Sequence, residues 1–360
     1  MSWFLAFAGF SLLVIFHEAG HFAAAKAVGM RVERFSLFFP PLLLRKKIGE
    51  TEYAIGALPV GGYVKITGMN PAEDLPDEVR TRAYTAQPVW KRVVVIAAGP
   101  AVNFVLGLLL LFVFFWQLGP REEVVGPFAK GFPAEHVLKK GDKVISIDGH
   151  GGSTTDFVKQ VATHKCAQSP PVDRCQAKTP ATLVIERNGV RQTIKVRPVY
   201  DAKQTKQPRL GFTYAPDGPR QGLSAGKAAS TSLDRFWFIT RETVKLPVRL
   251  FDPAYRKNVS GVVGSYETTR QTILHDPGDV VGVLAIISLS LAVINLFPFL
   301  PLDGGHIFWS LTEKVRGRPV PFSVMERSGF IGFALVLMLF IIGLNNDIGR
   351  ITSGQGFGVH

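Results

Sequence analysis

Four long apolar runs divide the chain. They cover about residues 3–25, 93–118, 280–300 and 329–344. A bilayer core about 30 Å thick needs roughly 20 apolar residues in a helix. The second and third runs meet this length without a charge, and the fourth reaches it when flanking residues are added. The pattern predicts a polytopic α-helical membrane protein with about four transmembrane helices.

The first run has a second interpretation, a secretory signal peptide. Ala23, Ala24 and Ala25 resemble a cleavage site. However, no basic segment precedes the run, and two histidines and a glutamate interrupt its apolar core, which is untypical of a signal peptide. We therefore expect residues 1–27 to remain as a membrane span.

Basic residues set the expected orientation. Lysines and arginines lie close to the apolar runs in the segments 28–92 and 306–328, and such residues are enriched in cytoplasmic loops. We expect these two segments to be cytoplasmic. The N-terminus, residues 119–279 and the tail at 346–360 would then be extracytoplasmic, in a multi-pass protein of the inner or plasma membrane.

The overall charge is strongly positive. The chain has 41 Lys and Arg against 28 Asp and Glu, a formal net charge of +13, and 47% of its residues are hydrophobic. This composition excludes an intrinsically disordered chain, which is poor in apolar residues. Because no basic block alternates with stacking aromatic residues, we assign the charge to topology and to anionic membrane lipid, and we expect no nucleic-acid partner.

Residues 119–200 have the pattern of a compact β-rich domain. Two alternating segments, 183–187 and 190–196, flank Asn188-Gly189, which is a strong hairpin signal. Residues 155–164 have helical spacing. The segment therefore predicts an inserted domain of strands with one short helix.

The chain has only two cysteines, which excludes a disulfide-framed mini-protein. Cys166 and Cys175 flank a Pro-rich loop inside the β-rich domain. Outside the cytoplasm they can form a disulfide, with two free thiols as the alternative.

Residues 223–250 predict a helix that does not cross the membrane. Charged residues such as Asp234 and Arg241 forbid a helix buried in lipid. Apolar or weakly polar positions recur on one face at helical spacing: Leu233, Phe236, Trp237, Thr240 and Val244. We expect an amphipathic helix on the outer leaflet or against the β-rich domain.

A motif of ionisable residues interrupts the first apolar run. His17-Glu18-Ala19-Gly20-His21 has the spacing H-E-x-x-H, which places both imidazoles on one face of a helix. Two such imidazoles can hold a zinc ion, with Glu18 beside the metal-bound water. Ionisable groups within a membrane span mark functional sites. The structural alternative is a pair of helix-packing histidines.

Zinc in a catalytic site needs a third protein ligand. Asp303 ends the third apolar run, and Pro298 and Pro301 break the helix before it. Broken backbone at membrane depth is tolerated where it lines protein or a water-filled cavity. We expect this segment to bend inward and offer Asp303 to the metal, helped by two glycines that loosen the backbone after it. His306 is the competing ligand.

Together these motifs resemble the site-2 proteases, which are intramembrane zinc metalloproteases and include the regulator-of-sigma-E proteases. The shared features are H-E-x-x-H at 17–21, Gly-x-x-x-Asn at 99–103, a PDZ-like domain between the second and third spans, a Ser-Gly-rich stretch at 260–264, and Asn-x-x-Pro with Leu-Asp-Gly at 295–304. The resemblance covers nearly the whole chain. One departure is the proline pair, which is Pro298-x-x-Pro301 in place of Pro-x-Pro.

The resemblance implies a role for each matching residue. His17, His21 and Asp303 would be the ligands of Zn²⁺, and Glu18 the catalytic base. Asn295, in the segment that Pro298 breaks, would hold the unwound substrate or stabilise the oxyanion. Asn103 would either share that role or make a hydrogen bond between helices.

Residues 55–65, which include Gly61 and Gly62, resemble the membrane-dipping β-hairpin of the family. A hairpin at about 52–67 would pair with an extended substrate as an added strand. Its structural alternative is an ordinary cytoplasmic hairpin. The PDZ-like domain would bind peptide C-termini or extended segments, or act only as a steric filter.

The expected partners are transmembrane protein substrates that have already been cut outside the membrane, such as anti-sigma factors or signal-peptide remnants. Two other functions remain open, a membrane zinc transporter or sensor and an inactive PDZ membrane adaptor.

In chain order we expect a first span with the zinc motif at 1–27, a hairpin region at 28–92, a second span at 93–118, a PDZ domain at 119–200, an amphipathic-helix region at 201–279, a third span with the broken ligand segment at 280–305, a cytoplasmic loop at 306–328, a fourth span at 329–345, and a tail at 346–360.

Overall fold

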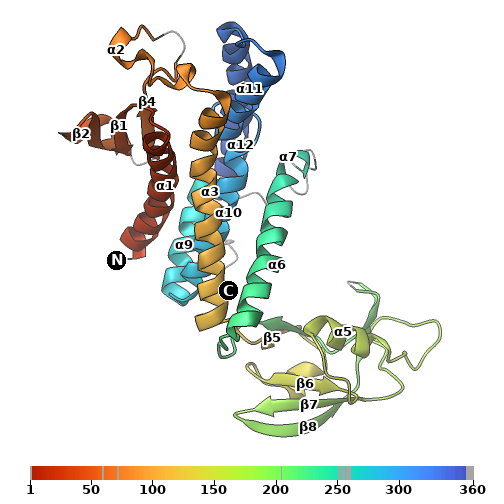
Figure 1. Cartoon of the computed structure of the whole chain (residues 1–360). Coiled ribbons are helices and arrows are strands. Elements are labelled where there is room, and N and C mark those ends of the chain that lie inside the picture. The colour runs from red at the N-terminus through yellow and green to blue at the C-terminus, as the bar shows by residue number, and fades with distance from the viewer. Residues whose placement is uncertain are drawn as a thin grey trace. The chain divides into compact units, whose positions relative to one another are not determined.

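The computed structural model describes residues 2–58, 61–70, 73–203, 205–249, 252, 256 and 261–353. Pro59, Val60, Ser260 and the end of the expected tail lie outside the described residues. The chain divides into two compact units (Figure 1). The first unit joins Met1–Trp116 with Ser224–His360, and the second is Gln117–Leu223.

Helices dominate the first unit. Its longer helices are α1 (Ser2–Ala27), α3 (Val89–Val113), α6 (Ala225–Val244), α9 (Val262–His275), α10 (Asp279–Asn295), α11 (Asp303–Arg316) and α12 (Phe322–Ser353). Shorter turns are α2 (Asp77–Arg80), η1 (Tyr84–Ala86), α7 (Leu246–Arg249) and a π-helical turn, Phe114–Leu118, which continues α3. α1, α10 and α11 all pack against α3, which makes α3 the centre of this unit.

Within the described residues, three helices are long and apolar enough to cross a membrane: Ser2–Ala27, Val89–Leu118 and Ser323–Ser353. The third expected span is the shorter α10, which has 17 residues because it ends at Asn295, ahead of the prolines. The fourth expected span, which looked short in the sequence, lies in the longest helix, α12, with 32 residues. Helix α12 continues through polar residues at both ends, so an apolar count alone underestimates it.

A four-stranded sheet follows α1. Its strands are β1 (Val32–Leu37), β2 (Phe39–Ile48), β3 (Thr51–Leu58) and β4 (Tyr63–Ile66), in the order β2-β3-β1-β4. β1 is parallel to β3 and antiparallel to β4. The expected hairpin at 52–67 is therefore wrong, because β1 lies between β3 and β4. The hairpin of this region is β2–β3, which turns at Gly49 with φ +62°.

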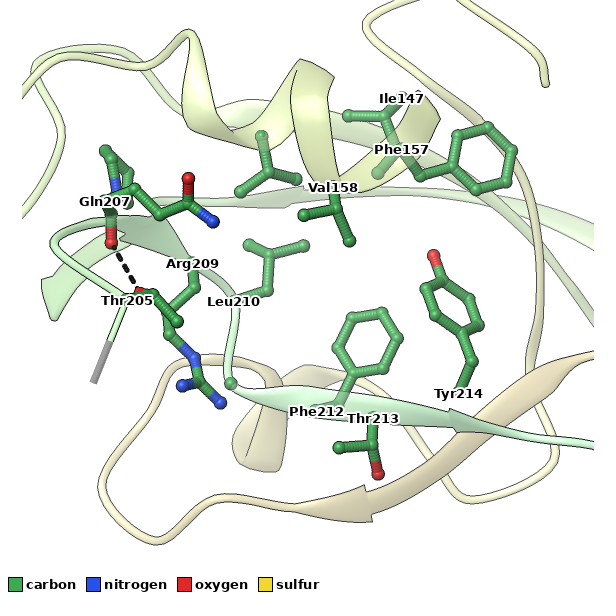
Figure 2. Close-up of a pocket in the computed structure, with 13 residues that line it drawn as sticks. Ile147, Phe157, Val158, Thr205, Gln207, Arg209, Leu210, Phe212, Thr213 and Tyr214 are labelled. Carbon is green, nitrogen blue, oxygen red and sulfur yellow. Dashed lines mark hydrogen bonds between the residues drawn. The ribbon is translucent and has the colours of Figure 1, made fainter. Parts of the chain in front are cut away.

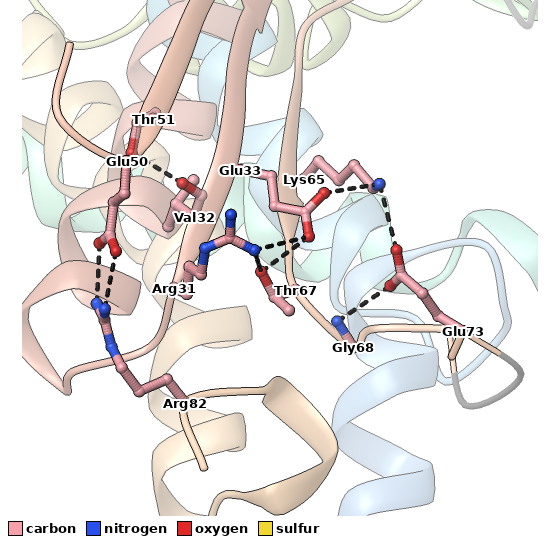
Figure 3. A network of polar contacts seen from close by, with 10 residues as sticks. All are labelled: Arg31, Val32, Glu33, Glu50, Thr51, Lys65, Thr67, Gly68, Glu73 and Arg82. Atoms are coloured by element: carbon pink, nitrogen blue, oxygen red, sulfur yellow. Dashed lines mark hydrogen bonds and ion pairs between the residues drawn. The ribbon is translucent and has the colours of Figure 1, made fainter. Parts of the chain in front are cut away.

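Ion pairs hold the base of this sheet (Figure 3). Glu33 lies 2.7 Å from Lys65, so that β1 and β4 are joined by charge as well as by the ladder. Arg82 donates two hydrogen bonds of 2.8 Å to Glu50 in the β2–β3 turn, and Lys26 at the end of α1 donates a third. These hydrogen bonds lower the pKa of Glu50 to about 2. The sheet is thus fastened to the end of α1.

The second unit is β-rich, as expected. Its elements are β5 (Val124–Phe128), α4 (Ala134–Val137), β6 (Lys143–Ile147), α5 (Thr154–Ala162), β7 (Ala181–Arg187), β8 (Val190–Val196), β9 (Val199–Asp201), β10 (Gln207–Arg209) and β11 (Phe212–Ala215). The β7–β8 hairpin at Asn188-Gly189 is confirmed, with both turn residues at positive φ. The boundary expected at residue 200 was too early, because β10 and β11 belong to this unit.

The two cysteines of this unit form a disulfide, Cys166–Cys175, with their Cα atoms 5.8 Å apart. The Cys175 carbonyl accepts a hydrogen bond from the Tyr200 backbone N–H. The disulfide loop is therefore joined to β9.

Helix α6 differs from its expected placement. It packs against α3 and α10, with Ala228, Ser232 and Ile239 buried. Phe236 of the expected apolar face packs 5.6 Å from the Phe104 ring on α3, whereas Leu233 and Trp237 of that face are 49% and 61% exposed. The small side chains of Ala228 and Ser232 permit close helix approach, which an apolar pattern does not reveal.

The Ser-Gly-rich stretch has a structural role at the start of α9. The carboxylate of Asp347 on α12 accepts hydrogen bonds from the backbone N–H groups of Gly264, at 2.7 Å, and Gly261, at 3.0 Å. Asp347 is fully buried, and a Cβ atom at either glycine would collide with it. The carboxylate satisfies N–H groups that a helix leaves unpaired at its N-terminus. This contact fastens α12 to α9.

Replacing Asp347 with alanine should therefore destabilise the first unit. Loss of the two hydrogen bonds to a carboxylate is expected to lower the free energy of unfolding by about 2 kcal/mol. Thermal unfolding in detergent should show a lower Tm for Asp347→Ala, with Asn345→Ala, an exposed position two residues away, as the control. Equal Tm values for the two variants would contradict this role.

Candidate functional site

Two histidines of α1 lie together inside the first unit. His17 and His21 are one turn apart and 6% and 7% exposed, and their Nε2 atoms are 3.2 Å apart. Their helix forms because the surrounding sequence is apolar and without proline. The H-E-x-x-H spacing thus places two nitrogen donors at one point.

Asp303 joins the two histidines from far along the chain. Its Oδ2 atom lies 3.1 Å from His17 Nε2 and 3.3 Å from His21 Nε2. As expected, the helix breaks after Asn295, and Asp303 begins the new helix α11. The following glycines have a different role from the one expected. Both are helical, and a Cβ atom on Gly304 would collide with the backbone of Leu296, so they permit a tight fold rather than loosening it.

These three groups fit a zinc ion by their chemistry and spacing. Zinc binds imidazole nitrogen and carboxylate oxygen at about 2.0–2.2 Å in a tetrahedron, which separates neighbouring ligand atoms by about 3.3 Å. The three measured separations are 3.1, 3.2 and 3.3 Å. His17, His21 and Asp303 can therefore share one ion. His306, the competing ligand, is not part of this group.

The other ring nitrogen of each histidine has a partner on α3. His21 Nδ1 lies 2.9 Å from the carbonyl oxygen of Val95, which can only accept. The Nδ1 atom therefore carries the proton, and the lone pair of Nε2 faces Asp303 and His17. Such contacts fix the tautomer of metal-binding histidines.

Asn103 contacts the other histidine, His17. Its side-chain amide is fully buried, with Nδ2 3.3 Å from His17 Nδ1, and its Oδ1 has no hydrogen-bond partner among the described residues. A half-turn of the amide would place Oδ1 against a protonated Nδ1, as a metal-bound His17 requires. The expected contact of Asn103 with substrate is not supported, because the residue lies behind His17 and is closed to solvent.

Glycines on both helices let α1 and α3 approach. Gly99 lies flat against the His21 ring, and a Cβ atom there would overlap the imidazole. Gly20 lies against the backbone of Ala98 in the same way. The Gly-x-x-x-Asn motif thus contacts both candidate ligands, Gly99 beside His21 and Asn103 beside His17. The four-residue spacing in the sequence indicates that Gly99 and Asn103 lie on one face of a helix. It does not show that this face contacts His21 and His17.

An ion pair that no sequence motif revealed holds α11 in place. Arg92 on α3 donates hydrogen bonds of 2.9 and 2.7 Å to the two carboxylate oxygens of Glu313. Arg92 is 7% exposed although it precedes an uncharged run. Because Glu313 and Asp303 share one helix, this bidentate pair helps to position the carboxylate ligand. No local sequence signal links residues 221 positions apart.

Glu18 lies beside strand β4. A Cβ atom on Gly62, the residue before β4, would be 3.0 Å from Glu18 Cγ. The start of β4 therefore lies next to the candidate catalytic base. Gly61, with φ +154°, lies against the ring of Phe39.

Two predicted residues lie in the break between α10 and α11. Asn295 is half-buried and donates a hydrogen bond to the Leu291 carbonyl of its own helix. Its side-chain oxygen makes no hydrogen bond to the residues that the structure describes. Pro298 is exposed in the turn that follows.

A second candidate site is a groove in the second unit (Figure 2). A cavity of about 340 Å³ lies between α5 and β11, and Figure 2 shows Phe157 and Val158 on one side with Phe212 and Tyr214 on the other. β11 pairs with β5 alone in its sheet. An apolar groove beside a free strand edge can accept an extended peptide.

Comparison with known proteins gives the family. Residues 5–339 match the model of peptidase family M50, and the chain belongs to this family. Similar proteins include a "Putative zinc metalloprotease" of Clostridium perfringens, 30% identical over 95% of this chain and 97% of the relative. Others with the same description are from Rhizobium meliloti, 30% identical over 94% of each chain, and Campylobacter jejuni, 29% identical over 95% of this chain and 91% of the relative.

Among solved structures, the PDZ domain of an SdrC-like protein from Listeria monocytogenes matches part of the chain. It is 17% identical, with a TM-score of 0.22, and the match covers 27% of this chain and 90% of that one.

The contact between Gly99 and His21 gives a prediction for metal binding. Gly99→Ala should displace the imidazole and reduce the zinc content of the purified protein several-fold, measured by elemental analysis. Ala101→Val, at an exposed position on the same helix, should keep full metal content. Stoichiometric zinc in Gly99→Ala would rule out this packing role.

Asn103 gives a separate prediction. Removing the partner of a ligating histidine typically lowers metal affinity 10- to 100-fold. We expect that loss in Asn103→Leu, and a smaller loss in Asn103→Asp, which keeps an acceptor oxygen beside His17. Competition with a chromogenic chelator measures both affinities, and equal affinities in the two variants would contradict the orienting role.

Proposed function

We propose that this chain is a zinc-dependent intramembrane endopeptidase. The observation that carries the proposal is that Asp303 meets His17 and His21. The two histidines and Glu18 lie on α1, a helix of membrane-spanning length. Membership of peptidase family M50 supports it. The substrates would be transmembrane segments of other proteins, because the site is built into apolar helices.

The chemistry follows from the donor set. His17, His21 and Asp303 would hold a zinc ion, which would supply Lewis-acid chemistry to a water molecule and a carbonyl group. Glu18 accepts the proton of the attacking water and returns it to the leaving amine nitrogen. Asn295 would hold a substrate backbone N–H through its side-chain oxygen, or the developing oxyanion through its side-chain NH2 group.

A transmembrane helix must unwind before its peptide bonds can be cut, because its backbone groups are paired within the helix. In this proposal the outer edge of β4 pairs with the unwound segment. This strand replaces the expected 52–67 hairpin as the partner of the substrate. The sheet order supports this role, since among the described strands β4 pairs with β1 alone, and so does the close approach of Gly62, next to β4, to Glu18.

The second unit would act as a PDZ domain outside the membrane. Its groove between α5 and β11 suits peptide C-termini or extended segments with apolar side chains. It would select membrane proteins already trimmed by another protease, such as anti-sigma factors or signal-peptide remnants. The β4 region would then be cytoplasmic, in keeping with its basic residues.

Glu18→Gln should retain zinc and lose cleavage. Glutamine keeps the size of the side chain but cannot accept the water proton, so the rate should fall by at least about 100-fold. Cleavage of a single-span model peptide in liposomes, with metal content measured on the same samples, gives the test.

The same variant separates the alternatives. A zinc transporter should tolerate Glu18→Gln, because Glu18 is not among the three grouped ligands, and an inactive adaptor should show no cleavage in the wild type. Wild-type cleavage that persists in Glu18→Gln would contradict the proposed mechanism.

A further inference from the structure

A cavity in the first unit is lined by strand β4 and by His306, which follows the candidate ligand Asp303 by three residues. Its volume is about 740 Å³. One wall is the whole of strand β4, and the other is formed by Leu300, His306 on α11, and the start of α12 at Met325, Glu326 and Gly329. A substrate strand added to the outer edge of β4 would occupy this cavity.

His306 is the imidazole on the wall opposite β4. It begins the turn after Asp303 on α11 and is half-buried. None of the described residues makes a hydrogen bond to its ring nitrogens, and it lies outside the three-ligand group. Partly buried polar groups in native proteins normally have partners. The imidazole therefore has hydrogen-bonding capacity that the described part of the chain does not use.

A bound substrate strand requires hydrogen-bond partners along both of its edges. An extended strand carries N–H and C=O groups along both of its edges. Pairing with β4 satisfies one edge and leaves the other facing α11 and α12. In surroundings without water, each unpaired backbone group is strongly unfavourable. The wall opposite β4 must therefore offer hydrogen bonds as well as shape.

We propose that His306 binds the substrate backbone on the edge that faces away from β4. A neutral imidazole donates from one nitrogen and accepts at the other, so it can pair with an N–H or a C=O group. The substrate strand is then held between β4 and His306, with Asp303 on the same helix fixing the distance from the metal. This inference rests on the proposed peptidase function and on strand addition at β4.

The test measures binding without turnover. The probe is a dye-labelled single-span peptide that the wild-type protein cleaves in liposomes, and its Kd is measured in the Glu18→Gln protein. Adding His306→Leu should weaken binding about tenfold, the value of about one hydrogen bond. His306→Gln, which can still donate and accept, should recover most of the affinity. Thr312→Leu is the control, because the Thr312 hydroxyl donates to the Phe308 carbonyl of its own helix.

Metal content separates the possible outcomes. Unchanged zinc in His306→Leu, with weaker peptide binding than in the Thr312→Leu control, supports a substrate-binding residue. Loss of zinc in His306→Leu would overturn the inference by making His306 a metal ligand. Unchanged peptide affinity would overturn it while leaving the peptidase intact. A wild-type protein that binds no zinc and cleaves no peptide would instead contradict the proposed function.

Discussion

The structure depends on bringing three electron-rich groups together within apolar helices. Two imidazole nitrogens and one carboxylate oxygen lie 3.1–3.3 Å apart. Such a cluster is unfavourable in a membrane without a cation or protons to share. The surrounding chain is arranged to meet that constraint. Val95 and Asn103 hold the outer nitrogens of the histidines, Arg92 holds the helix that carries Asp303, and glycines let the helices approach.

The constraint also explains the architecture around it. The carboxylate must arrive from a different segment, so a helix ends at Asn295 and another starts at Asp303. Tight packing of the intervening turn requires glycine at 304, where a side chain would meet backbone. On the other side of the site, β4 approaches Glu18 because Gly62 has no Cβ atom. At Gly304 and at Gly62 the absence of a Cβ atom lets the backbone pack closely. At Gly62 this places the start of β4 next to Glu18.

The sequence predicted those parts whose signal is local. The H-E-x-x-H spacing fixes a helical face, the Asn188-Gly189 hairpin has a defined turn chemistry, and Pro298 with Pro301 marks a helix break. Asp303 was predictable because few ionisable residues lie within the apolar runs. The failures involve pairing between distant segments. Nothing in 52–67 indicates that β1 separates β3 from β4, and nothing in Arg92 indicates Glu313. The packed face of α6 was predicted only in part: Phe236 packs as expected, but the small residues Ala228 and Ser232 are buried while Leu233 and Trp237 are exposed.

The central claim is that two imidazoles of α1 and the carboxylate of Asp303 hold one zinc ion. X-ray absorption at the zinc edge of the purified protein in detergent tests it most directly. We predict one bound zinc with two imidazole nitrogens and oxygen donors at about 2.0–2.2 Å, and a changed spectrum in Asp303→Asn. A zinc ion without two imidazole ligands, or a spectrum that Asp303→Asn leaves unaltered, would contradict this claim.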